Sequence, residues 1–206
     1  MNELRDGIER TIKDLCAAGD FTGASAAVVR GYGVEIIGFF AAHHKSEEDA
    51  CEVFSIWSER VLRGLPTFAG QCSVRTWIYT VARNASHNFK RDAVARRRVA
   101  SADSEAIAAV AAEVRTETRP YLRTEAKTKL AELRDALPPD DRMRLVLRLD
   151  KGLDWNDVAR VMLGEEAVVD EGSLKRAAQR ERKRFQILKE RLIEEGRRAG
   201  LLPTDK

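Results

Sequence analysis

Apolar residues recur along most of the chain at the three- and four-residue spacing of an amphipathic α-helix, and the alternation typical of half-buried strands is absent. The helical spacing runs from Ile8 through Val61 and resumes from Leu130 onward. This pattern predicts an all-α protein. In the first half, the expected helices are Glu3–Ala18, Gly23–Ala42 and Glu47–Arg63, with Asp20 and Ser46 as N-caps.

Residues 65–98 run from a loop that contains Pro66 and Gly70 into a fourth expected helix with one apolar and one basic side. The apolar stripe consists of Val74, Ile78, Val81, Ala82, Ala85 and Phe89. The other side carries Arg75, Thr76, Tyr79, Arg83, His87 and Lys90. Between Ser73 and Arg98 there are seven Lys or Arg residues against the single acid Asp92, which favours an anionic partner such as DNA. A solvated charged face without a partner is the alternative.

The stretch from Val99 to Thr118 is rich in Ala, Ser and acids and contains no aromatic residue. We therefore expect it to bury little and to act as a flexible tether, with transient helix formation as the alternative. The chain then divides into two small helical domains, residues 1–98 and 124–206, joined by a linker at residues 99–123.

The second domain is expected to contain successive helices with short turns, which is typical of a helix-turn-helix. Its expected helices are Thr124–Ala136, Asp141–Leu149, a short helix capped by Asp154 that ends at Met162, and a long helix capped by Ser173 that ends near Glu195. On the long helix, Leu174, Ala178, Phe185, Leu188 and Leu192 form an apolar stripe, and Lys175, Arg176, Gln179, Arg180 and Lys183 lie opposite. Such a helix suits the major groove, where Arg and Lys pair with guanine and Gln with adenine. A solubilising final helix is the alternative.

The composition, 44 % hydrophobic and 33 % charged over 206 residues, is that of a highly charged globular protein, and the net charge of +3 is modest. Apolar runs are short and the N-terminus does not resemble a signal peptide, so we expect no membrane insertion and a cytoplasmic location. Cys16, Cys51 and Cys72 form no CxxC pair and are expected to be small buried hydrophobes. With His43 and His44 they do not form a zinc ligand set, so neither a metal nor a cofactor is expected.

No catalytic constellation is evident: the chain lacks a glycine-rich phosphate loop, a nucleophile beside a histidine, and a two-metal carboxylate cluster, so we do not expect an enzyme. A group of acids opens the helix that carries Phe54 and Trp57; its members are Glu47, Glu48, Asp49 and Glu52. These carboxylates either stabilise the helix dipole or form a docking surface for a basic protein, with Phe54 and Trp57 divided between core and interface.

Five segments, in order, resemble extracytoplasmic-function sigma factors of the sigma-70 superfamily: SEEDACEVFSIWSERV, LPTFAG, SVRTWIYTVARNASHNFKRD, LRDALPPDDRMRLVLRLDKGLDWNDVARVML and SLKRAAQRERKRF. The resemblance covers nearly the whole chain. It implies a first domain, region 2, that binds the clamp of RNA polymerase and melts the minus-10 element. It implies a second domain, region 4, that reads the minus-35 element, and an anti-sigma protein as a regulatory partner.

The resemblance also implies roles for individual residues. Glu48, Asp49 and Glu52 would contact core RNA polymerase, with Trp57 supporting that surface. For the minus-10 DNA, the candidates are Phe68 and Gly70 in the loop that receives a flipped base, Asn84 on the non-template strand, and Arg75, Tyr79, Arg83 and Lys90 nearby. For the minus-35 DNA, the candidates are Lys175, Arg176, Gln179, Arg180 and Lys183. A helix-turn-helix regulator that acts without joining the polymerase is the alternative.

Overall fold

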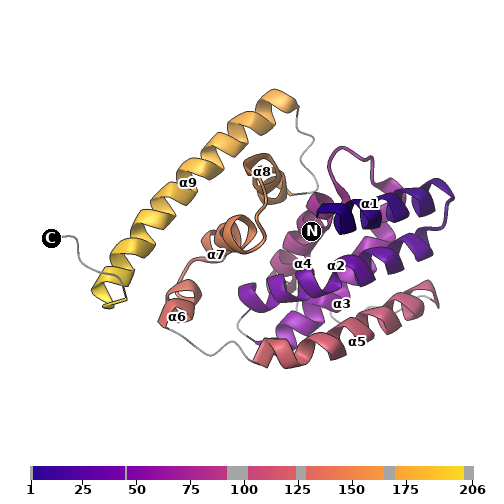
Figure 1. Cartoon of the computed structure of the whole chain (residues 1–206), viewed down its shortest axis with the longest axis horizontal. Coiled ribbons are helices and arrows are strands. Elements are labelled where there is room, and N and C mark those ends of the chain that lie inside the picture. The colour runs from indigo at the N-terminus through magenta and orange to yellow at the C-terminus, as the bar shows by residue number, and fades with distance from the viewer. Residues whose placement is uncertain (1, 45, 92–101, 124–128, 165–169, 202–206) are drawn as a thin grey trace. The chain divides into compact units, whose positions relative to one another are not determined.

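The computed structural model describes residues 2–44, 46–91, 102–123, 129–164 and 170–201, and every regular element in these ranges is helical. The all-α prediction is therefore confirmed. The chain forms two compact units, Met1–Leu122 and Arg123–Lys206. Figure 1 shows the helices of each unit.

The first unit is built around α2 (Phe21–His43), which packs against α1 (Asn2–Ala17), α3 (Glu47–Gly64) and α4 (Val74–Arg91). A 3-10 turn, η1 (Leu65–Thr67), follows α3. The caps are those expected: the Asp20 carboxylate accepts from the amide of Gly23 at 2.8 Å, and the Ser46 hydroxyl accepts from the amide of Asp49 at 3.3 Å. The largest fully buried side chains include Tyr32, Phe39, Phe40, Phe54, Trp57 and Tyr79.

The expected tether is wrong for most of its length, because residues 102–123 form a helix, α5 (Ala102–Arg123), that belongs to the first unit. Its buried side chains are Ile107, Val110, Ala111 and Val114. Gly33 of α2 admits this helix, since a Cβ there would lie 2.8 Å from a methyl group of Val114. The buried positions follow the spacing i, i+3, i+4, i+7, which is a helical stripe of small side chains. Residues 99–101 lie outside the described ranges.

The expectation that no segment could span a membrane was too strong. Among the described residues, α2 is long and apolar enough to do so by length and composition alone. In the structure it is the central helix of the unit, and 56 % of its most apolar window is buried. The apolar character of α2 is accounted for by the packing of three other helices around it.

The second unit contains α6 (Lys129–Asp135), α7 (Pro139–Leu145), η3 (Val146–Asp150), α8 (Trp155–Leu163) and α9 (Glu171–Arg198). The element η3 is a π-helical continuation of α7. Asp154 caps α8 as expected, accepting from the amide of Asp157 at 2.9 Å. Ser173 does not cap α9: the cap is Asp170, whose carboxylate accepts from the amide of Ser173 at 3.0 Å. The helix also continues to Arg198, past the expected end near Glu195.

Two apolar clusters hold the second unit together. One joins α8 to the start of α9 through Ala159, Leu174, Ala177 and Ala178, with Trp155 packed against them. The other joins Leu137 and Leu145 to Leu188, with Phe185 and Leu192 alongside. The predicted apolar stripe of the long helix is thus the one that faces the core.

Candidate nucleic-acid interface

The apolar stripe predicted for α4 is confirmed, because each of its six residues is at most 7 % exposed: Val74, Ile78, Val81, Ala82, Ala85 and Phe89. These side chains fix α4 against α2 and α3. The indole of Trp57 on α3 adds a polar contact, donating from Nε1 to the carbonyl oxygen of Ile78 at 3.1 Å. The orientation of the helix is therefore set by apolar burial together with one buried hydrogen bond.

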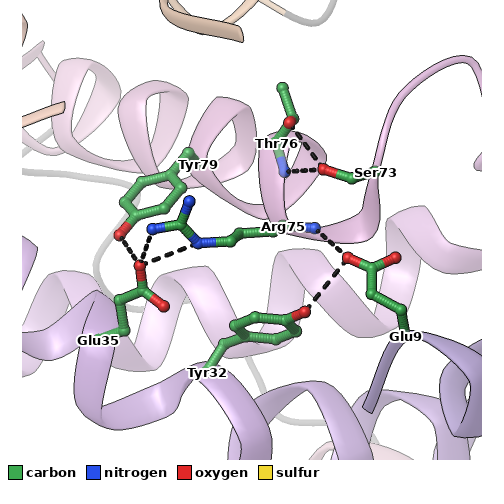
Figure 2. A network of polar contacts seen from close by, with 7 residues as sticks. All are labelled: Glu9, Tyr32, Glu35, Ser73, Arg75, Thr76 and Tyr79. Carbon is green, nitrogen blue, oxygen red and sulfur yellow. Dashed lines mark hydrogen bonds and ion pairs between the residues drawn. The ribbon is translucent and has the colours of Figure 1, made fainter. Parts of the chain in front are cut away.

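The start of α4 is held by two side chains, one local and one distant (Figure 2). The Ser73 hydroxyl accepts from the amide of Thr76 at 3.0 Å, which is an ordinary N-cap bond. The Glu9 carboxylate, on α1, accepts from the amides of Val74 at 3.0 Å and Arg75 at 2.9 Å. A carboxylate is well placed here, since the first amides of a helix lack internal partners and carry partial positive charge. Tyr32 also donates to Glu9, at 3.2 Å.

A second carboxylate, Glu35 of α2, holds two side chains of α4 (Figure 2). It accepts from Nε of Arg75 at 3.0 Å, from Nη2 of the same guanidinium, and from the hydroxyl of Tyr79 at 2.8 Å. Burial acts to raise the pKa of Glu35, but the hydrogen bonds and charge of Arg75, with the bond from Tyr79, outweigh it and lower the pKa. The pKa of Tyr79 is raised, first by burial and then by the charge of Glu35.

These contacts correct the expected basic side of α4. Tyr79 is fully buried and Thr76 is 1 % exposed, so neither lies on an outer face. The side chain of Arg75 is 15 % exposed and is paired within the protein. Position 79 borders the apolar stripe, and its ring can be buried because Glu35 accepts its hydroxyl hydrogen. Tyr79 and Arg75 are therefore parts of the helix anchor and not free DNA ligands.

Glu9 and Glu35 are functional candidates that the sequence analysis did not identify. Glu35 had a recognisable signal, because it is the only acid in the apolar helix α2. A lone acid among buried positions needs a partner. Glu9 had no such signal, because α1 is rich in charged residues of both signs.

The remaining outer face of α4 carries Arg83, Asn84 and His87, which are partly or fully exposed. The Nε of Arg83 is buried and has no hydrogen-bond partner among the described residues. The side chain of Lys90 lies outside what the structure describes. Of the six residues expected on the basic side, Arg83 and His87 are the ones that the structure leaves at the surface apart from the paired Arg75.

The loop before α4 is anchored by one aromatic contact. Phe68 packs on Trp77 with ring centroids 5.0 Å apart, and Trp77 lies half-buried at the edge of the core. Gly64 allows this packing, since a Cβ there would lie 2.9 Å from the indole. Gly70 is exposed and has φ +67°, a left-handed conformation that favours glycine. The loop thus presents backbone at Gly70 while Phe68 anchors it.

The acidic residues of α3 differ in how far the fold exposes them to solvent. Glu48 is exposed, Asp49 and Glu52 are half-buried, and none of the three forms an ion pair with a residue that the structure describes. Trp57 is fully buried and stacks on Phe54 with centroids 5.2 Å apart. Trp57 and Phe54 therefore both belong to the core and not to the interface, and Trp57 can support the α3 surface only from beneath.

The outer face of α9 agrees with the sequence prediction. Five polar side chains are exposed along it: Lys175, Arg176, Gln179, Arg180 and Lys183. Two of them have local contacts, since Lys175 donates to Glu171 at 2.6 Å and Arg176 to the Ser173 hydroxyl at 2.8 Å. Both contacts are solvent-exposed and weak, so they do not prevent binding to an anion.

A buried ion pair joins α7 to α9 behind that face. Arg144 donates from Nε to Glu181 at 2.6 Å and from Nη1 to Asp141 at 2.7 Å, and Arg144 and Glu181 are each less than 10 % exposed. Arg184 reaches the same carboxylate at 2.9 Å. The charges of α9 therefore have two roles, because Glu181 and Arg184 fix the helix while the residues opposite remain exposed.

Histidines and cysteines do not gather into a metal site in the described part of the chain. His43 and His44 are buried at the end of α2, where Nε2 of His44 lies 3.0 Å from the hydroxyl of Ser86. The three cysteines form no disulfide and are half-buried, so they are less buried than expected.

A helical unit in a helix-turn-helix arrangement with an exposed basic face on α9, joined in one chain to a second helical unit, has the features of a DNA-binding transcription protein. The chain is similar to the RNA polymerase sigma-H factor of Pseudomonas aeruginosa, with 29 % identity over 143 residues, covering 66 % of this chain and 72 % of that protein. This similarity supports the resemblance to sigma factors of the sigma-70 superfamily. No family model matches the chain. No solved structure matches it either.

The anchor at Glu35 makes stability depend on pH in a defined direction. Because the folded-state pKa of Glu35 is lowered, its contribution is present above the ordinary carboxylate pKa and is lost as the pH falls through the folded value. We expect the difference in unfolding free energy between the wild type and Glu35→Gln to shrink as the pH falls below the ordinary carboxylate range, at about pH 5 and lower. Urea unfolding at several pH values measures this difference. A difference that does not change with pH would contradict the assignment.

Proposed function

We propose that this chain is a sigma factor of the extracytoplasmic-function type, which joins core RNA polymerase and directs initiation at specific promoters without catalysing a reaction itself. The observation that carries the proposal is the similarity to the sigma-H factor over 66 % of the chain. The order of the acidic helix, loop, basic helix and helix-turn-helix gives independent support. In this proposal the first unit acts as region 2 and the second as region 4.

The proposed polymerase-binding surface is the acidic side of α3, formed by Glu48, Asp49 and Glu52. The helix dipole explains acids in the first turn, where Glu48 and Asp49 lie. Glu52 lies one turn further, where the dipole effect is weak. Because these carboxylates form no ion pair with the described residues, they are available to a basic partner.

The proposed DNA contacts lie on both units. On the first unit they are Phe68 and Gly70 of the loop and Arg83, Asn84 and Lys90 of α4. The exposed Gly70 backbone and the cations of α4 have the chemistry that a melted strand with an unstacked base requires. On the second unit they are Lys175, Arg176, Gln179, Arg180 and Lys183, which have the side-chain chemistry for base edges and phosphates.

The partners of the proposed function follow from these surfaces. They are core RNA polymerase at the acids of α3 and promoter DNA at the cations of α4 and α9. A regulatory protein of the anti-sigma kind would inhibit the chain by covering either surface. The proposed place of action is the cytoplasm, where the polymerase and the chromosome are found.

Reversing charge on the proposed polymerase surface should abolish assembly without unfolding the chain. We expect wild-type protein to co-elute with core RNA polymerase and to support run-off transcription from genomic fragments. Asp49→Lys with Glu52→Lys should weaken this binding at least about tenfold, because like charges then face each other. Circular dichroism checks that the variant is folded.

The matched control reverses two exposed acids elsewhere in the first unit, Glu105→Lys with Glu113→Lys, and should bind as the wild type does. Equal binding by both double variants would contradict the assigned surface. Failure of the wild type to bind polymerase would overturn the proposed function. If the wild type instead bound a palindromic site as a dimer without polymerase, the alternative of an independent helix-turn-helix regulator would stand.

A further inference from the structure

An open pocket of about 660 Å³ lies in the first unit between α1 and the loop that precedes α4. Arg5, Arg10 and Lys13 line it from α1, and Gly70 and Ser73 line it from the loop side. None of the three basic residues belongs to the faces identified in the sequence. The pocket therefore adds a surface that adjoins the proposed DNA-binding loop but comes from a different helix.

The charge that this pocket presents is positive. Its acids are Asp6 and Glu9, but both oxygens of Glu9 already accept hydrogen bonds within the protein, including two from the start of α4. The Arg75 guanidinium, which also lines the pocket, is likewise paired with Glu35. The donors to Glu9 are neutral and leave its charge in place, so the three cations of α1 exceed the two acids of the pocket by one.

The three α1 cations are also unpaired among the residues that the structure describes, because none has a carboxylate within 4.0 Å of its charged nitrogens. Cations held together on one wall without partners attract an extended anion. The pocket is open and larger than one phosphate group, which fits a passing chain of phosphates better than a small enclosed ligand.

We propose that this pocket binds the phosphodiester backbone of single-stranded promoter DNA, with Arg10 and Lys13 as its main ligands. The inference rests on the proposed function. A strand that places a base at the loop near Gly70 must carry its phosphates past the neighbouring wall, and α1 forms that wall. Basic grooves beside base-binding loops are the usual arrangement for single-strand binding.

The test uses the full chain and a fluorescein-labelled single-stranded DNA of 15 randomised nucleotides, followed by fluorescence anisotropy at several salt concentrations. The variant is Arg10→Glu with Lys13→Glu. The control, Arg30→Glu with Arg63→Glu, makes the same change in net charge at exposed positions outside the pocket. Arg10→Lys with Lys13→Arg keeps the charges and should bind as the wild type does.

We expect the pocket variant to lose affinity about tenfold more than the control at low salt. Its slope of log affinity against log salt should be smaller by about 1.4, which corresponds to two lost contacts with single-strand phosphates. Equal losses in the two charge-reversed variants would overturn the inference. Preferential binding of a deca-glutamate peptide over the DNA, with the same sensitivity to the variants, would also overturn it in favour of an acidic protein partner.

A failure of the pocket inference can be distinguished from a failure of the proposed function. Run-off transcription by the wild type with core RNA polymerase tests that function without reference to the pocket. If transcription occurs and the pocket variant opens promoters as well as the control does, the inference fails while the proposed function stands. If the wild type does not support transcription, the proposed function fails.

Discussion

Replacing Arg75 with methionine is expected to destabilise the first unit by about 3 kcal/mol, the lower end of the cost of breaking a buried ion pair. The cost arises because the Glu35 carboxylate, only 20 % exposed, would lose its charged partner. The lower end applies because both side chains retain some contact with water. Urea unfolding followed by tryptophan fluorescence measures the change in the unfolding free energy.

Two further variants separate this explanation from a general loss of charge. Arg63→Met removes an exposed arginine of the same unit and should change stability by no more than about 0.5 kcal/mol. Combining Arg75→Met with Glu35→Gln should recover most of the loss, because the neutral amide no longer needs a cation and its oxygen still accepts from Tyr79. A cost for Arg75→Met no larger than that for Arg63→Met would contradict the anchor role.

Replacing Arg144 with methionine is expected to destabilise the second unit by about 3 kcal/mol as well. Glu181 and Asp141 would both lose their buried partner, although Arg184 would still reach Glu181. Hydrogen exchange measures the effect, since amides of α8 and α9 should exchange faster while those of α2 should not change.

The companion experiment removes the charge on both sides of this pair. Arg144→Met with Glu181→Leu should restore most of the protection of α8 and α9, because no uncompensated charge is then left buried. Unchanged exchange in the Arg144→Met single variant would show that the pair does not hold α9 in place. In that case the apolar clusters around Leu174 and Leu188 would account for its position.

Local features of the fold could be predicted because their causes lie within a few residues. The caps at Ser46 and Asp154 each bind an amide three residues ahead. The start of α9 was misplaced for the same kind of reason, because Asp170 and Ser173 are both good caps and only one is used. The packing of α5 was not predicted because most residues around Ile107 and Val110 are alanines. The helical periodicity of large apolar side chains is therefore weak in this segment.

The candidate site was predicted less completely, because a count of charges along a helix does not reveal their partners. Arg75 pairs with Glu35, which lies 40 residues earlier, and Arg144 pairs with Glu181, which lies 37 residues later. Only the tertiary structure distinguishes such structural cations from exposed ones such as Lys175. The same limit concealed the basic wall of α1, where cations alternate with acids in the sequence and are sorted by the fold.

The packing of α5 also decides where the chain can be cut. A fragment ending at residue 98, the boundary that composition suggests, would lack Ile107, Val110 and Val114. The surface around Gly33 and Phe54, which Val114 covers, would then be exposed to water. Such a fragment should be poorly soluble and prone to self-association. A fragment that ends after α5 keeps the helix that covers this apolar surface.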